Sequence, residues 1–319
     1  MSKTISTEIL WTLKVKMKIL ILGAGGIGGY FGAHLIRCGA DVTYLLRAKR
    51  KSLIDENGLR IESPHGDFVV YPKTVSAETI QPGFDLVIVT AKAYDLQDAL
   101  RSLAPVLDTA VVLPFLNGFD HLDVLDEKLG RERVMGGVAH IAATIKADGT
   151  VQQLSDLHVL TVGARHDAHS AVADEFVALC EKAPFKCRSA TNIEQVLWDK
   201  WVFLATLAGM TTSCRAAVGD IVATPLGSEL TRQMYAECCA VAEAFDYPVN
   251  ENARSKALEM LTQKGSTFTA SMLRDLLAGS RTEADHILGG LIDRAHQKPL
   301  SVPLLGLAYT HMLTEQKAD

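Results

Sequence analysis

Residues 18–30, KILILGAGGIGGY, place a short apolar run directly before a glycine-rich turn and a helix-like segment. The run at residues 18–22 has the length and hydrophobicity of a buried strand. Gly23, Gly25 and Gly28 follow it in GxGxxG spacing, and a second strand is expected at residues 42–46. A strand, turn and helix of this kind begin a doubly wound parallel sheet, so this junction constrains the fold more than any other segment.

The chemistry of the glycine turn is that of a dinucleotide site. Gly23 permits the tight turn, Gly25 allows the backbone to approach a pyrophosphate, and Gly28 allows the helix to lie close to the strand. The first amides of that helix would face the phosphates. The expected cofactor-binding residues of the turn are Gly23, Ala24, Gly25, Gly26, Ile27 and Gly28. The alternative is a glycine turn that binds nothing, but its position between strand and helix favours the dinucleotide.

The end of the second strand indicates which dinucleotide is bound. NAD sites usually place an acid there, about 20 residues after the first glycine. This chain has Arg47 instead, followed by Lys49, Arg50 and Lys51, and Asp41 stands at the other end of the strand. A guanidinium can bind a 2′-phosphate through two hydrogen bonds, so NADPH is the expected cofactor. The alternative for residues 49–51 is a solvated basic loop.

Composition narrows the class of protein. The chain has 319 residues, 48% of them hydrophobic and 22% charged, and a formal charge of −5, so neither nucleic acid nor an anionic membrane is an expected partner. The six cysteines have no paired spacing and are interpreted as free, mostly buried thiols of a cytoplasmic protein. The ten histidines show no metal-ligand spacing, and no segment is long and apolar enough to cross a bilayer.

The pattern of elements predicts two domains after an N-terminal extension at residues 1–16, which is expected to be disordered. Alternating strands and helices predict a Rossmann-type domain at 17–189, and a purely helical pattern predicts a second domain at 190–319. Strands are expected at 18–22, 42–46, 59–62, 68–71, 86–90, 110–113 and 134–140, with hairpins around 64–67 and 147–149. Helices are expected at 26–37, 171–182, 198–207, 229–244, 251–261, 270–277, 283–296 and 303–313. Thr191 and Glu194 have the spacing of a capping box.

Four further residues are candidates for chemistry. Lys92 and Asn117 follow strands of the predicted parallel sheet, whose carboxyl ends form the ligand-binding edge. Their alternatives are a solvated lysine and an Asn-Gly turn. Lys200 lies in an apolar helix, where a lysine must extend to solvent, pair or function. Glu283 is either functional or an acid that caps a helix.

Several ordered motifs resemble the ketopantoate reductases (2-dehydropantoate 2-reductases), from Met17 to about Leu313. The motifs are GAGGIG at 23–28, TAKAYD at 90–95, LNG at 116–118, WDK at 198–200 and SMLRDLLAGSRTEAD at 271–285. The resemblance implies that Lys200 donates the proton to the substrate carbonyl and that Asn117 orients cofactor and substrate. It further implies that Glu283 lies at the cofactor–substrate junction and that Ser271 binds the substrate carboxylate. Lys92 and Arg47 would contact NADPH.

The resemblance has exceptions in the expected substrate pocket. Leu204, Ala208 and Leu288 stand where the best-studied branch of the family has asparagines. The expected function is NADPH-dependent reduction of a small 2-oxo acid, with ketopantoate and pantothenate biosynthesis as the leading assignment. A more apolar 2-oxo acid or ketone is the alternative within the family, and a non-catalytic NADPH sensor is the alternative outside it. A homodimer is compatible with these features.

Overall fold

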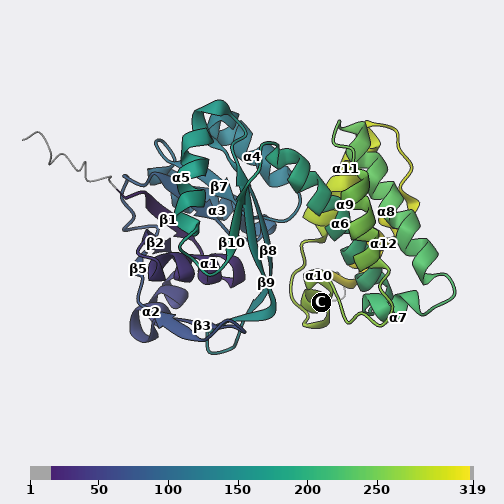
Figure 1. Ribbon diagram of the computed structural model, residues 1–319, viewed down its shortest axis with the longest axis horizontal. Coiled ribbons are helices and arrows are strands. Elements are labelled where there is room, and N and C mark those ends of the chain that lie inside the picture. The colour runs from purple at the N-terminus through teal and green to yellow at the C-terminus, as the bar shows by residue number, and fades with distance from the viewer. Residues whose placement is uncertain (1–15, 317–319) are drawn as a thin grey trace, which may run out of the picture.

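The computed structural model describes residues 16–316 as a sheet-containing half followed by a helical half (Figure 1). Apart from Lys16, the extension expected at residues 1–16 lies outside the described residues. Strands end at β10 (Lys186–Ser189), and every later element is helical. The expected order, a parallel α/β sheet followed by helices, is therefore confirmed.

The first half is built on a five-stranded parallel sheet. Its order is β5-β2-β1-β6-β7, with bounds β1 (Lys18–Leu22), β2 (Asp41–Leu45), β5 (Lys73–Val75), β6 (Leu86–Val89) and β7 (Val111–Pro114). Since all these strands run in one direction, their carboxyl ends meet at one edge, as expected. The edge strand β5 was missed because its three residues, KTV, contain a single apolar side chain and so show no apolar run.

A second sheet covers the first helix. It contains β3 (Leu59–Glu62), β4 (Phe68–Val70), β8 (Gly136–Ile145), β9 (Val151–Gly163) and β10. Both expected hairpins are present, because β3 pairs antiparallel with β4 and β8 with β9. The expected hairpin at 147–149 implied β9 without giving its bounds, and β10 was missed, because polar residues interrupt the apolar run in β9 and replace it in β10.

Five α-helices belong to this half: α1 (Gly26–Arg37), α2 (Ala48–Asn57), α3 (Leu96–Leu103), α4 (Asp120–Leu129) and α5 (Ser170–Cys180). Helix α1 lies between the two sheets and contacts β1 and β2 on one side and β3, β8 and β9 on the other. The basic residues 49–51 belong to the first turn of α2, so their interpretation as a loop is wrong.

The second half contains α6 (Ile193–Cys214), α7 (Val218–Val222), α8 (Gly227–Ala244), α9 (Glu251–Leu261), α10 (Ser271–Leu277), α11 (Gly290–Gln297) and α12 (Pro303–Gln316). A π-helical turn, Asp285–Gly289, precedes α11, so the helix expected at 283–296 is not a uniform α-helix. The expected capping box is wrong: the side chain of Asn192 accepts the Gln195 amide at 3.1 Å. Glu194 instead accepts hydrogen bonds from Arg165 at 2.9 Å and Tyr247 at 2.8 Å.

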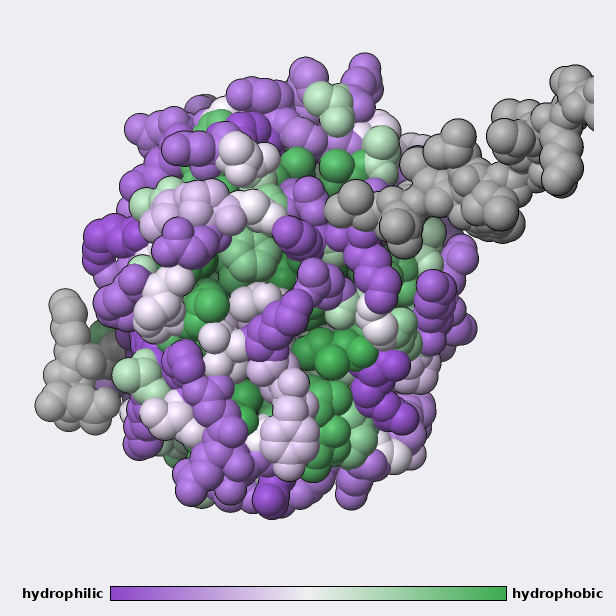
Figure 2. Space-filling model, turned by 90° about the vertical axis from the view of Figure 1, so that its left-hand side faces the viewer, coloured by the Kyte–Doolittle hydropathy of each residue, from purple (hydrophilic) through white to green (hydrophobic). Residues whose placement is uncertain are grey.

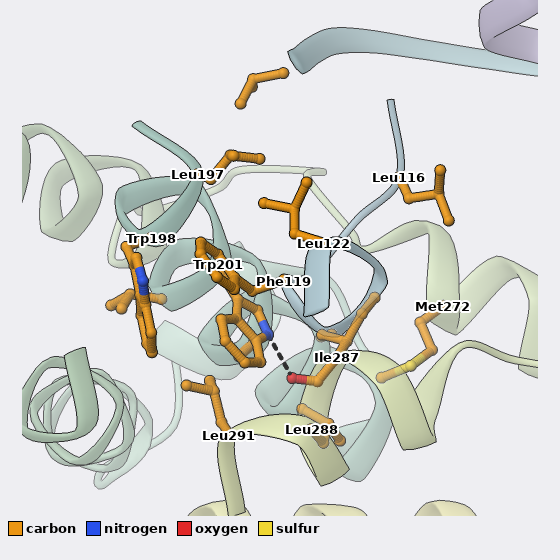
Figure 3. Close-up of a cluster of buried hydrophobic side chains, with 14 of the residues drawn as sticks. Leu116, Phe119, Leu122, Leu197, Trp198, Trp201, Met272, Ile287, Leu288 and Leu291 are labelled. Carbon is orange, nitrogen blue, oxygen red and sulfur yellow. Dashed lines mark hydrogen bonds between the residues drawn. The ribbon is translucent and has the colours of Figure 1, made fainter. Parts of the chain in front are cut away.

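A buried apolar cluster joins the two halves (Figure 3). Phe119, just before α4, lies 5.3 Å from Trp198 of α6 between ring centroids, and Trp198 lies 5.0 Å from Trp201. Trp201 also donates its indole N–H to the backbone oxygen of Ile287 at 2.9 Å. Large aromatic side chains contribute much of the apolar area in such contacts. Helix α6 is therefore fixed against both the sheet half and the π-helical turn.

The surface and the cysteines agree with most of the compositional expectations. The face turned to the viewer in Figure 2 is mainly hydrophilic, with hydrophobic side chains in small patches. Among residues 16–316, no helix has the length and hydrophobicity needed to cross a membrane. All six cysteines are free, but only Cys180, Cys238 and Cys239 are buried, fewer than the sequence suggested.

Candidate active site

The glycine turn after β1 has the shape required by a dinucleotide. A Cβ at Gly28 would lie 2.5 Å from the Thr90 hydroxyl and still closer to the Gly23 carbonyl, so only glycine allows this approach of helix and strand. A Cβ at Gly25 would meet no atom within 4 Å, which leaves the turn open on its outer side. Within the described part of the chain no side chain caps the start of α1, so its first amides are available to an anion. The turn therefore fits a pyrophosphate.

Arg50 stabilises this turn by a hydrogen bond to its backbone, a role that the sequence did not reveal. Its guanidinium donates to the backbone oxygen of Ala24 at 2.8 Å and to that of Gly149 at 2.6 Å. Gly149 lies in the hairpin between β8 and β9, almost 100 residues away along the chain. No local pattern predicts such a contact, because it depends on how the second sheet packs over α2.

Arg47 lies at the carboxyl end of β2, in the place that the sequence indicated. It is the N-cap residue of α2, and its side chain is 77% exposed. The guanidinium forms an ion pair with Asp95 at 3.2 Å. An exposed cation at this edge, with no acid at the end of β2, is suited to a 2′-phosphate.

Lys92 and Glu283 form an ion pair that bridges the two halves. Lys92 Nζ lies 3.1 Å from Glu283 Oε2 and 3.3 Å from Asp275 Oδ2, while the Ala93 amide donates to Glu283 Oε1 at 3.2 Å. Burial opposes the charge of Lys92, but the two carboxylates raise its pKa overall. Glu283 is almost fully buried and stands before the π-helical turn. It binds Lys92 and a backbone amide of the other half, so capping alone does not describe it.

Lys200 projects from α6 toward the carboxyl edge of the parallel sheet. Its Nζ donates to Asn117 Oδ1 at 3.1 Å and to the backbone oxygen of Ala139 at 3.0 Å. Burial lowers the pKa of Lys200 to about 8, although the Glu283 carboxylate acts in the opposite direction. An ammonium has three N–H donors, and among residues 16–316 these two oxygens account for two of them. One donor is thus available for a substrate oxygen.

Asn117 connects the lysine to the acid. While its Oδ1 accepts from Lys200, its Nδ2 faces Glu283 Oε2 at 3.5 Å, a long hydrogen bond. Four predicted site residues therefore form one connected set, which we call the central cluster: Lys92, Asn117, Lys200 and Glu283. These residues are up to 191 positions apart in the chain.

The remaining predicted residues lie outside the central cluster. Ser271 is exposed and begins α10, and no hydrogen bond joins it to the cluster within residues 16–316. Leu204 is partly buried and lies one helical turn after Lys200, on the same face of α6. Ala208 and Leu288 are buried. Asp275 joins the cluster through Lys92, and no sequence pattern had singled it out.

Solved structures share this fold over almost the whole chain. The PanE/ApbA family ketopantoate reductase from Ralstonia eutropha JMP134 is 25% identical with a TM-score of 0.85, covering 95% of this chain and 99% of that one. D-mandelate dehydrogenase, solved with NADH and anilino(oxo)acetate, is 20% identical with the same TM-score and the same two coverages. The fold, together with a family match over residues 19–167, shows an NAD(P)-dependent oxidoreductase.

The family follows from the sequence comparison. The family model "Ketopantoate reductase PanE/ApbA" matches residues 19–167, and the model of its C-terminal part matches residues 192–315. The chain belongs to the ketopantoate reductase PanE/ApbA family, whose members reduce small 2-oxo acids with NAD(P)H. The uncharacterized oxidoreductase YkpB of Bacillus subtilis (strain 168) is 32% identical over 309 residues, covering 93% of this chain and 98% of that protein.

Proposed function

We propose that this chain reduces a small 2-oxo acid with NADPH, with ketopantoate as the leading substrate and pantoate, a precursor of pantothenate, as the product. The observation that carries the proposal is the hydrogen-bonded lysine of the central cluster, Lys200, whose pKa is lowered to about 8. A general acid acts best when its pKa lies near the working pH. An ordinary surface lysine, with a pKa of about 10.4, is a weaker acid by more than two units.

The residues divide the work of reduction as follows. NADPH, when bound, supplies the hydride to the carbonyl carbon. Lys200 donates a proton to the carbonyl oxygen, which completes the hydroxyl group, and the neutral amine then regains a proton from solvent. Asn117 keeps the amine directed toward the reacting carbonyl through its bond to Nζ. The family resemblance adds Ser271 as the residue that binds the substrate carboxylate.

Glu283 and Lys92 hold the two halves of the protein together around the reacting groups. The carboxylate of Glu283 also favours the ammonium form of Lys200, and so keeps the proton available. Arg47 is the proposed partner of the 2′-phosphate and accounts for the choice of NADPH over NADH.

A more apolar 2-oxo acid is the second candidate substrate, because apolar side chains adjoin Lys200 on α6. Leu204 lies one turn away, and the ring of Phe203 stacks on that of Phe268 with centroids 6.3 Å apart. Phe268 is 39% exposed although it is a large hydrophobic residue. An apolar substrate side chain would cover these groups, whereas the hydroxyl of ketopantoate would find fewer polar partners there.

Oxidation of NADPH against a panel of 2-oxo acids tests the proposal. The panel includes ketopantoate together with acids that carry straight, branched and aromatic side chains. The highest kcat/KM is expected for ketopantoate, and a branched or aromatic acid in first place would select the second candidate. NADPH binding without turnover of any member would support a sensor and contradict the enzymatic proposal.

A further inference from the structure

A π-helical turn lies where the residues of the central cluster meet. It spans Asp285–Gly289 and begins two residues after Glu283, and the Ile287 amide donates to the backbone oxygen of Glu283 at 2.9 Å. On its other side, the oxygen of Ile287 accepts the indole N–H of Trp201, the neighbour of Lys200 (Figure 3). π-Helical turns are rare in proteins, and those that occur lie frequently at functional sites. This one is bonded both to the residue after Lys200 and to Glu283.

His286 extends from the π-helical turn to the loop that carries Asn117. Its ring lies so close to Gly118 that a Cβ there would be 2.7 Å from His286 Cδ2. Gly118 also has a φ of +78°, so two independent reasons exclude a larger residue from this position. The ring of His286 donates a hydrogen bond to the backbone carbonyl of Asn117, and its side chain is only 12% exposed. The loop is thus held at the residue that contacts Lys200.

A second histidine, His121, is fully buried and contacts the ring of His286. Nδ1 of His121 is 3.4 Å from Nε2 of His286, and the ring centroids are 5.6 Å apart. Two neutral imidazoles can share one proton in an N–H···N bond, since each ring has one donor and one acceptor. His121 belongs to α4, so the pair connects the sheet half to the π-helical turn.

The surroundings of the pair allow both histidines to stay neutral. Burial lowers the pKa of both histidines. The carboxylates of Asp120 and Glu283 favour the charge of His286, with Asp120 Oδ2 at 3.9 Å from its Nδ1, and Arg294 opposes it. The cations that face His121 all oppose its protonation: His286 when charged, Arg165, Lys200 and Arg294.

We propose that His286, supported by His121, is a positioning residue for the reductase reaction. It holds the loop with Asn117 at the distance from which Asn117 reaches both Lys200 and Glu283. The inference rests on the proposed function, since positioning matters only if Lys200 acts as the acid. The inference adds a pair of histidines that do not contact the reacting atoms but fix the position of Asn117 beside Lys200.

The test compares four full-length proteins on the best 2-oxo acid of the panel. His286→Phe keeps an aromatic ring, somewhat larger than imidazole, and removes both nitrogens, whereas His286→Gln keeps one donor and one acceptor. His169→Phe is the matched control, because His169 is also a buried histidine but lies far along the chain in the Asp167–His169 turn. Melting temperature, Kd for NADPH, KM and kcat are measured for each.

Positioning predicts a selective loss of turnover. His286→Phe should lower kcat by about 10-fold to 100-fold, the range expected when a reacting group is misplaced by up to ~1 Å, with little change in Kd for NADPH. His286→Gln should regain at least several-fold of the loss, and His169→Phe should turn over as the unmodified protein does. If His286→Phe does not fold, His121→Phe takes its place, with an expected loss of about 3-fold to 10-fold.

Two outcomes overturn the inference, and they are distinguishable. If the unmodified protein reduces a 2-oxo acid and the His286 variants keep its kcat, the positioning role is wrong and the proposed function stands. If the unmodified protein binds NADPH and reduces no member of the panel, the proposed function is wrong and the inference is lost with it.

Discussion

Replacing Glu283 by glutamine should move the basic limb of the pH–rate profile to lower pH. In the proposed mechanism the ammonium form of Lys200 is the proton donor, so activity should be present below its pKa and be lost as the pH rises through about 8. The Glu283 carboxylate raises that pKa, because a negative charge favours the protonated amine. Removal of this charge leaves burial unopposed, and the donor loses its proton at lower pH.

The size of the shift follows from the geometry of the central cluster. Hydrogen bonds of 3.1 and 3.5 Å through Asn117 join Lys200 to Glu283. With the amide of Asn117 between them, we take the two charges to be roughly 7 Å apart, for which Coulomb's law at an effective dielectric constant of about 20 gives ~2 kcal/mol. At about 1.4 kcal/mol per pKa unit, the basic limb should move down by about 1 to 2 units.

The assay is kcat/KM for the best 2-oxo acid between pH 5.5 and 10, because this ratio reports the free enzyme. Asp275→Asn is the matched control: Asp275 also pairs with Lys92, at 3.3 Å, but does not contact Asn117 or Lys200. Its profile should stay close to that of the unmodified protein. A basic limb that stays in place or moves upward in Glu283→Gln would refute the reasoning, as would equal shifts in both variants.

Three further predictions concern the cofactor, the acid and the N-terminus. Arg47→Asp should weaken NADPH binding by about tenfold or more, since a charge-assisted hydrogen bond contributes ~1.5–3 kcal/mol. The affinity for NADH should change little. Equal NADH and NADPH affinities in the unmodified protein would contradict this prediction. Lys200→Ala should lower kcat by roughly 10²–10⁴-fold with Kd for NADPH almost unchanged, and it should remove the basic limb near pH 8. A parallel fall in melting temperature, NADPH affinity and kcat would show instead that Lys200 anchors the helix. A chain beginning at Met17 should fold and bind NADPH normally, because among the described contacts it loses only the hydrogen bond from Lys16 to the backbone oxygen of Gly39. Circular dichroism and NADPH titration check this. Loss of folding or of binding would show that the segment is structural.

Local patterns were sufficient for the class of fold and for the individual candidates. The strand before Gly23 and the glycine spacing are short-range features, and so is the exchange of the usual acid for Arg47. The order of strands and helices predicted a parallel sheet, whose geometry requires Lys92 and Asn117 to share an edge with the glycine turn. The family motifs pointed to Lys200, Glu283 and Ser271 before any contact was known.

Elements without a strong local signal could not be predicted in the same way. Strand β10, KCRS, is polar and short, and it forms only because β9 lies beside it. The first turn of α2 contains three basic residues, yet Arg50 finds acceptors in Ala24 and Gly149. Such partners become available only after distant segments pack, so tertiary contacts overrode the local preference.

The sequence by itself determined the parallel sheet, the glycine turn and the types of the candidate site residues, because each depends on neighbours a few positions apart. Only the tertiary structure decided how those residues are combined. Asn117 contacts Lys200 across 83 positions, and Lys92 pairs with Glu283 across 191. The histidine pair and the lowered pKa of Lys200 likewise arise from packing and burial. Distance, desolvation and the sign of nearby charges are properties of the folded chain, and the reactivity of this site depends on all three.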